Sequence, residues 1–165
     1  MSTKSQQLQI RVTADQKAAL KRLARDAGQD LSGYVLARAL PEARLRFAEI
    51  IRALRGGEDH RFALAELNDL LADLTRAQLS DAVAVAPPEL RDLSPLLQNY
   101  VAAMVEQASH QREVPAPSWG RDVPPLEAPY FATPLRSLRL HLLRAAPAPF
   151  KRRNIFVDSG VGARV

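Results

Sequence analysis

The sequence predicts a mainly α-helical fold with one short β-strand near its N-terminus. Three observations lead to this prediction. A strictly alternating segment comes first, apolar residues then recur at helical spacing as far as residue 113, and prolines interrupt the remainder. The 165 residues suffice for one ordinary domain or two small ones. A hydrophobic content of 47% with 25% charged residues indicates a folded core rather than wholesale disorder.

The predicted strand covers residues 8–12, where apolar and polar side chains alternate. Its apolar face carries Leu8, Ile10 and Val12, and its polar face carries Gln7, Gln9 and Arg11. A single short strand can neither bury its apolar face nor satisfy its edges alone. The segment therefore predicts pairing with a second copy of the chain.

Two helices are predicted to follow the strand. Thr13 and Gln16 have the spacing of a capping box, so a helix should begin just after Thr13. Gly28 suits the left-handed position that ends a helix. Ser32 can cap a second helix, and Pro41 disfavours helical geometry in the residue before it. We therefore expect a first domain over residues 1–41.

Apolar stripes predict three more helices, over residues 43–54, 63–74 and 93–108. Ser94-Pro95 has the form of a cap followed by a proline in the first helical turn. Beyond residue 113 stand eight of the 12 prolines, which exclude long helices there, and one short helix is expected over residues 135–144. The tail, residues 150–157, is either a terminal strand or an extended arm.

The net charge of +5 is distributed unevenly along the chain. Residues 1–55 carry 11 Lys and Arg against 5 Asp and Glu, residues 56–113 carry 4 against 10, and residues 114–165 carry 8 against 3. A basic head predicts a polyanionic partner, for which an acidic middle is a poor surface. We therefore expect a helical acidic region over residues 42–113 and a Pro-rich basic segment over residues 114–165, with roles different from that of the head.

Residues 7–40 contain a strand, a capping box, a terminating glycine and a Ser-capped helix, and in this order they resemble the ribbon-helix-helix family of Arc and MetJ type. They look particularly like bacterial antitoxins that begin with such a domain. The resemblance implies a homodimer, or a higher homo-oligomer, whose paired strands enter the major groove of double-stranded operator DNA. It implies a dimer core of Leu8, Ile10 and Val12, base contacts from Gln7, Gln9 and Arg11, and phosphate contacts from Leu31, Ser32 and Gly33.

The chemistry of the polar face suits these roles, because arginine can donate two hydrogen bonds to guanine and glutamine can pair with adenine. The amides that begin a helix, at the positive end of its dipole, suit a phosphate. The alternative is an ordinary edge strand with polar outward residues.

The resemblance also implies a use for the long extension, because antitoxins of this class wrap a cognate toxin with their C-terminal part, often ordering only on binding. Large and basic side chains in the Pro-rich segment are the candidate contacts. They are Trp119, Tyr130, Phe131, Phe150, Arg152, Arg153 and Phe156. The alternative is that the aromatics cover the chain's own small core and that the basic residues are a solvated strand edge.

Catalysis, metals and cofactors are not expected. Without cysteine the chain has no disulfide, thiolate zinc site or cysteine nucleophile. His60, His110 and His141 lack a metal-ligand spacing, and no phosphate loop, nucleophile elbow or dinucleotide-binding fingerprint is present. No apolar run approaches the length of a membrane span, and the first residues lack a signal-peptide core. We expect a cytoplasmic protein without a membrane partner.

Three functions remain open. The first is an antitoxin that represses its own operon as a DNA-bound dimer and neutralises a toxin through its C-terminal part. The second is a ribbon-helix-helix transcriptional regulator without a toxin, whose extension serves oligomerisation or ligand sensing. The third is an enzyme or a structural partner-binding protein whose head only dimerises.

Overall fold

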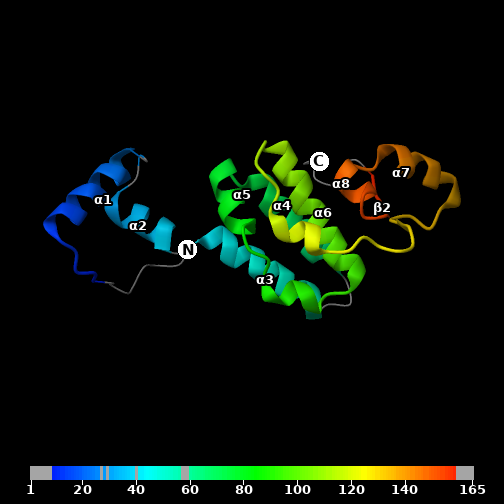
Figure 1. Ribbon diagram of the computed structural model, residues 1–165, viewed down its shortest axis with the longest axis horizontal. Coiled ribbons are helices and arrows are strands. Elements are labelled where there is room, and N and C mark those ends of the chain that lie inside the picture. The colour runs from blue at the N-terminus through cyan, green and yellow to red at the C-terminus, as the bar shows by residue number, and fades with distance from the viewer. Residues whose placement is uncertain (1–8, 27, 29, 40, 57–59, 159–165) are drawn as a thin grey trace. The chain divides into compact units, whose positions relative to one another are not determined.

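The computed structural model describes residues 9–26, 28, 30–39, 41–56 and 60–158. The chain divides into two compact units, residues 1–41 and residues 42–165. The first unit contains helices α1 (Ala14–Asp26) and α2 (Leu31–Ala39) (Figure 1). Within the described ranges, no helix combines the length and the apolar character that crossing a lipid bilayer requires.

Helix α1 begins where its capping box predicts. The Gln16 amide donates to Thr13 Oγ1 at 3.2 Å, and the Thr13 amide donates to Gln16 Oε1 at 3.0 Å. After the helix, Gly28 has a φ of 66°, and its amide donates to the Arg25 carbonyl at 3.0 Å. Glycine adopts this left-handed conformation without the steric cost of a Cβ. Both predicted limits of the helix are confirmed.

The cap of α2 is Asp30, and the prediction of Ser32 is wrong. The Tyr34 amide donates to the Asp30 carbonyl at 2.9 Å, and the Gly33 amide donates to Asp30 Oδ1. Aspartate and serine are both strong N-cap residues, and the two lie only two positions apart.

The predicted N-terminal strand is not shown. Residues 9–12 have no regular secondary structure, and Gln7 and Leu8 lie outside the described residues. A strand is defined by hydrogen bonds to a neighbouring strand, and the structure contains a single copy of the chain. The ribbon formed by two chains therefore stays a prediction.

The first unit buries little of its own apolar surface. Ala24 of α1 is a buried hydrophobic residue of this unit, whereas Ile10, Val12 and Leu23 are 61%, 42% and 49% exposed. Helices in proteins gain most of their stability from packing an apolar face. The described part of this unit therefore requires further apolar surface to pack against.

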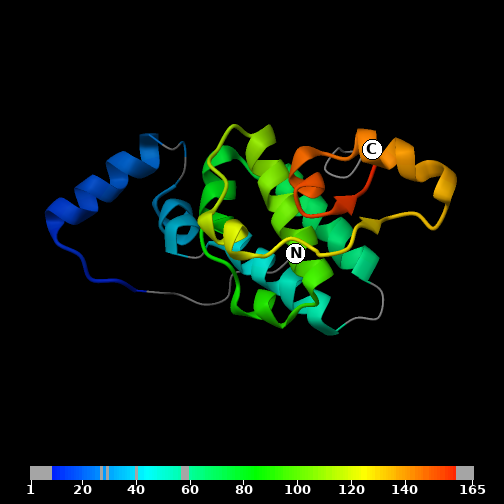
Figure 2. The same ribbon diagram turned by 45° about the vertical axis from the view of Figure 1, so that its right-hand side comes forward.

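The second unit is helical along most of its length (Figures 1 and 2). Its α-helices are α3 (Glu42–Gly56), α4 (His60–Asp73), α5 (Arg76–Val83), α6 (Pro95–Gln111), α7 (Arg139–Ala145) and α8 (Ala148–Lys151). Its 3-10 helices are η1 (Pro88–Asp92), η2 (Ser118–Asp122) and η3 (Arg136–Leu138). The three helices predicted from apolar stripes are confirmed as α3, α4 and α6, the last with Ser94 as its cap.

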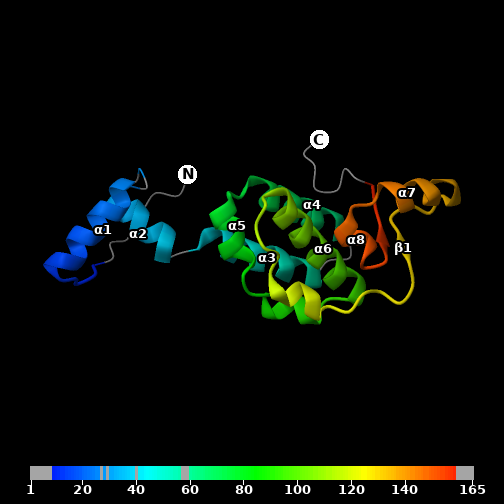
Figure 3. The same cartoon turned by 45° about the horizontal axis from the view of Figure 1, so that its top comes forward.

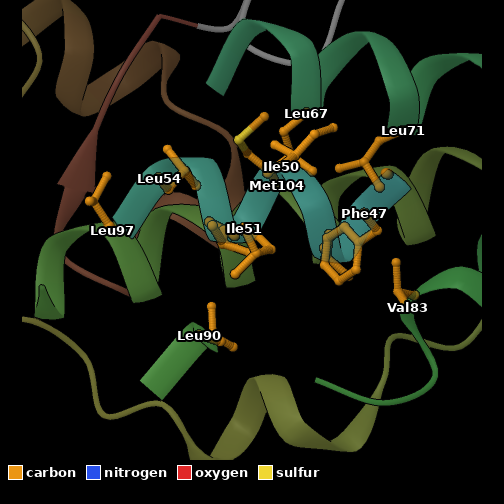
Figure 4. Packing of buried hydrophobic residues seen from close by; sticks show 14 of the residues in the cluster. Phe47, Ile50, Ile51, Leu54, Leu67, Leu71, Val83, Leu90, Leu97 and Met104 are labelled. Carbon is orange, nitrogen blue, oxygen red and sulfur yellow. The ribbon is translucent and has the colours of Figure 1, made fainter. Parts of the chain in front are cut away.

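Helix α3 lies at the centre of the core of this unit and packs against α4, α5 and η1. Figure 4 shows it between Leu67 and Leu71 of α4 on one side and Leu90 of η1 on the other. Its buried side chains are Phe47, Ile50, Ile51 and Leu54. Their spacing of three, four and seven residues puts one apolar face of the helix into the core.

Helix α5 is not among the helices predicted from the sequence, although its signal is the same as that of α1. Thr75 and Gln78 form a second capping box, in which the Thr75 amide donates to Gln78 Oε1 at 3.0 Å. Eight residues are too few for a clear apolar stripe, so the cap is the stronger signal.

The Pro-rich segment belongs to the same compact unit as the acidic helices. Strands β1 (Tyr130–Phe131) and β2 (Ile155–Phe156) pair in parallel, with Tyr130 opposite Ile155 (Figure 3). Asn154, just before β2, has a left-handed φ of 58°, and its side-chain Nδ2 donates to the Leu126 carbonyl at 2.6 Å. The tail is therefore a short helix followed by a strand.

Burial raises the pKa of Tyr100 in α6 to about 12, with a smaller contribution from Tyr130. The fold thus favours the neutral phenol, and this stability is present below the unfolded pKa of about 10 and lost as the pH rises toward about 12. We expect the free energy of unfolding in urea to fall by about 2 kcal/mol over this window. Tyr100→Phe should remove that part of the decrease, whereas Tyr34→Phe should retain it. An unchanged slope in Tyr100→Phe would contradict the assignment.

Candidate functional site

The predicted base-contact residues of the first unit lie at its exposed start. Gln9 and Arg11 are exposed, and so are their apolar neighbours Ile10 and Val12. The third predicted base-contact residue, Gln7, lies outside the described residues. This segment therefore exposes polar and apolar side chains together, which is what the pairing with a second strand requires.

The predicted phosphate contacts lie in the first turn of α2, where the structure adds a competing group. Leu31, Ser32 and Gly33 occupy this turn, but the Gly33 amide already donates to the Asp30 carboxylate. That carboxylate carries negative charge at the end of the helix where a phosphate is expected. Asp30 is thus a residue of this candidate site that the sequence analysis missed.

The structure separates the seven predicted partner contacts into three groups. Trp119, Arg152 and Arg153 line one pocket. Tyr130, Phe131 and Phe156 lie on the two-stranded sheet, where the Phe131 and Phe156 rings stack at 4.9 Å. Phe150 is fully buried in the core, edge-on to the Tyr100 ring at 5.4 Å, so its side chain is not on the surface of the free chain.

The pocket has a volume of about 320 Å³ and lies between α6, the loop containing η2, and the end of α8. Trp119 of η2 is fixed at its wall, because its Nε1 donates to the Val83 carbonyl at 2.8 Å. Arg121 also lines it. Glu106 of α6 is its one acidic lining residue and pairs with Arg152, and with Arg153 at 3.7 Å.

Arg153 is the buried cation of this pocket, with its side chain 9% exposed. It donates from Nη2 to the Gly120 carbonyl at 2.7 Å, and from Nη1 to Asn99 Oδ1 at 3.3 Å and the Val123 carbonyl at 3.4 Å. Burial lowers the pKa of Arg153, and the Glu106 carboxylate opposes this shift. The guanidinium holds the η2 loop against α6, whereas its Nε is buried without an acceptor among the described residues.

A second surface, which sequence analysis missed, covers η3 and α7. Leucines are exposed here beside arginines, and Arg139 stacks over the Phe131 ring at 4.9 Å. Leu140, 72% exposed, and Leu143 are three residues apart and share a helix face. We call this the leucine–arginine surface, and it consists of Leu135, Leu138, Leu140, Leu143, Arg136 and Arg139. Its signal in the sequence is the absence of any acidic residue from 128 to 157, a range with six basic residues.

Metal ligands do not gather in the part of the chain that the structure describes, which contains no group of three His, Asp or Glu side chains able to hold an ion. His141 Nε2 lies 3.6 Å from Asp158 Oδ2, on an exposed surface.

Comparison with known proteins bears on the first unit. No curated protein and no solved structure matches the chain. A family model described as "Antitoxin TacA 1-like" matches residues 7–51, about a quarter of the chain. This segment includes the exposed start, α1, α2 and the first ten residues of α3. The first unit, with the beginning of α3, is therefore similar to an antitoxin domain.

Proposed function

We propose that this protein is the antitoxin of a bacterial toxin–antitoxin pair. It dimerises through residues 8–12, binds operator DNA in the cytoplasm, represses its own operon and neutralises a toxin through residues 42–165. It acts by binding and not by catalysis. The observation that carries the proposal is the similarity of residues 7–51 to an antitoxin family.

The DNA-binding part of the proposal rests on the first unit. Its exposed Ile10 and Val12 lack cover, and pairing two chains as an antiparallel ribbon would bury both. The same pairing would leave Gln9 and Arg11 on the opposite face, where they can reach base edges.

Asp30 provides a test of the phosphate contact at α2. Asparagine caps a helix as well as aspartate does, but without the negative charge. The variant Asp30→Asn is therefore expected to keep the helix and to bind operator DNA about fivefold more tightly. Fluorescence anisotropy with the promoter fragment of its own operon measures the effect. Equal or weaker binding by a variant of unchanged helicity would contradict a phosphate site at α2.

The toxin-binding part of the proposal rests on the leucine–arginine surface. Exposed leucines favour a protein over a nucleic acid, since nucleic-acid contacts are predominantly polar. The exposed arginines of this surface, Arg136 and Arg139, favour a partner of opposite charge. We therefore assign this surface to a toxin with an acidic-rimmed apolar groove.

The experiment co-expresses the full-length chain with each neighbouring gene product. The expected result is that one neighbour stops growth alone and is neutralised by the wild-type chain, whereas Leu140→Asp/Leu143→Asp fails to neutralise it. The control is Leu45→Asp/Val85→Asp, which alters two exposed apolar residues elsewhere in the second unit. Neutralisation by both double variants would overturn the assigned surface, and the absence of any toxic neighbour would overturn the antitoxin role.

A further inference from the structure

The pocket beside Trp119 has an excess of positive charge. Three guanidinium groups, of Arg121, Arg152 and Arg153, line it together with the single carboxylate of Glu106. Glu106 pairs with Arg152 and Arg153. An anion entering the pocket would therefore meet two net positive charges.

The guanidinium groups of this pocket differ in whether they are free to bind a ligand. Among the described residues, Arg121 is exposed and its side chain forms no hydrogen bond or ion pair. The Arg153 guanidinium is already engaged, because its Nη1 and Nη2 donate to Asn99 Oδ1 and the Gly120 carbonyl. Its Nε is buried among protein atoms, out of reach of a ligand in the pocket. Arg121 is therefore the guanidinium that a ligand can engage.

The remaining wall of the pocket is apolar. It combines the Trp119 indole with small aliphatic groups, namely Ala102, Val105, Val123 and Pro125. The volume of about 320 Å³ is at the lower end of the range for small-molecule sites. The wall and the volume suit a compact apolar body of about ten non-hydrogen atoms.

We propose that this pocket binds a small organic monocarboxylate, with its carboxylate at Arg121 and its apolar body against Trp119. Guanidinium groups hydrogen-bond carboxylates in a planar geometry. The proposal does not rest on the antitoxin role, and it assigns a ligand site to the second unit whether or not a toxin binds the leucine–arginine surface.

The chain contains a single tryptophan, Trp119, so intrinsic tryptophan fluorescence reports on this pocket alone. The probe is cyclohexanecarboxylate, which is titrated into the full-length chain beside its neutral analogue cyclohexanecarboxamide and beside inorganic phosphate. We expect a saturable blue shift with the carboxylate only, with a dissociation constant on the order of 1 mM.

Variants of opposite expected effect localise the binding. Arg121→Gln should weaken the carboxylate about fivefold, because it removes an unpaired cation. Glu106→Gln should tighten it, because it removes the opposing charge. Arg91→Gln, which removes an exposed cation from η1 outside the pocket, should leave the dissociation constant unchanged.

Three outcomes would overturn the proposal. They are no spectral change with the carboxylate at concentrations on the order of 10 mM, an equal response to the carboxamide, and an equal response to inorganic phosphate. An effect of Arg91→Gln as large as that of Arg121→Gln would also overturn the proposal, because the carboxylate would then be attracted by the net charge of the protein and not by this pocket.

Discussion

The variant Ile10→Asp is expected to be monomeric under conditions in which the wild-type chain is dimeric. Ile10 is 61% exposed in the single chain, but it would be buried at the centre of a paired ribbon. Pairing would then bring two unpaired carboxylates into an apolar core, at a cost of several kcal/mol. We expect the dimer dissociation constant to rise more than about 1,000-fold. Sedimentation equilibrium over a range of concentrations measures this change, and operator binding should be lost with it.

Arg11→Ala is the matched control, since it changes the adjacent residue on the opposite face of the strand. It should leave the dimer intact and weaken specific operator binding by about 1–3 kcal/mol. If Ile10→Asp remained dimeric with wild-type affinity, the chains would pair elsewhere, because an aspartate is readily tolerated at a site that stays exposed.

The signals that succeeded in the sequence are short-range. The Thr13–Gln16 capping box and Gly28 act within one helical turn, so neighbouring residues suffice to predict them. The error at α2 has the same origin. Asp30 and Ser32 are equally good caps by residue type, so residue type alone does not decide between two positions this close together.

The features that the sequence did not predict require distant parts of the chain. The candidate ligand pocket combines residues near 105, 120 and 153. No local sequence pattern predicts that these three segments lie close together. Strand β1 has only two residues and pairs with β2 some 25 positions later, in register Tyr130 with Ile155. The predicted N-terminal strand depends on a second chain, so a single chain can neither form it nor exclude it.

Phe150 illustrates how burial decides between two predicted roles. An aromatic beside basic residues fits a partner contact as well as a core position. The structure puts the Phe150 side chain at 0% exposure among α6 and α8 residues, with its ring edge-on to Tyr100 at 5.4 Å. Phe150 therefore stabilises the free chain, and any influence on a partner would be indirect.

Phe150→Ala is accordingly expected to lower the free energy of unfolding of the second unit by about 3–5 kcal/mol, as large core truncations do. Phe62→Ala is the matched control, because Phe62 is 80% exposed in the same unit and its loss should change stability by less than about 0.5 kcal/mol. Urea denaturation followed by circular dichroism compares the two variants. If Phe150→Ala were as stable as Phe62→Ala, the Phe150 ring would contribute little to the stability of the core. That result would favour the other predicted role of Phe150, a contact with a partner protein.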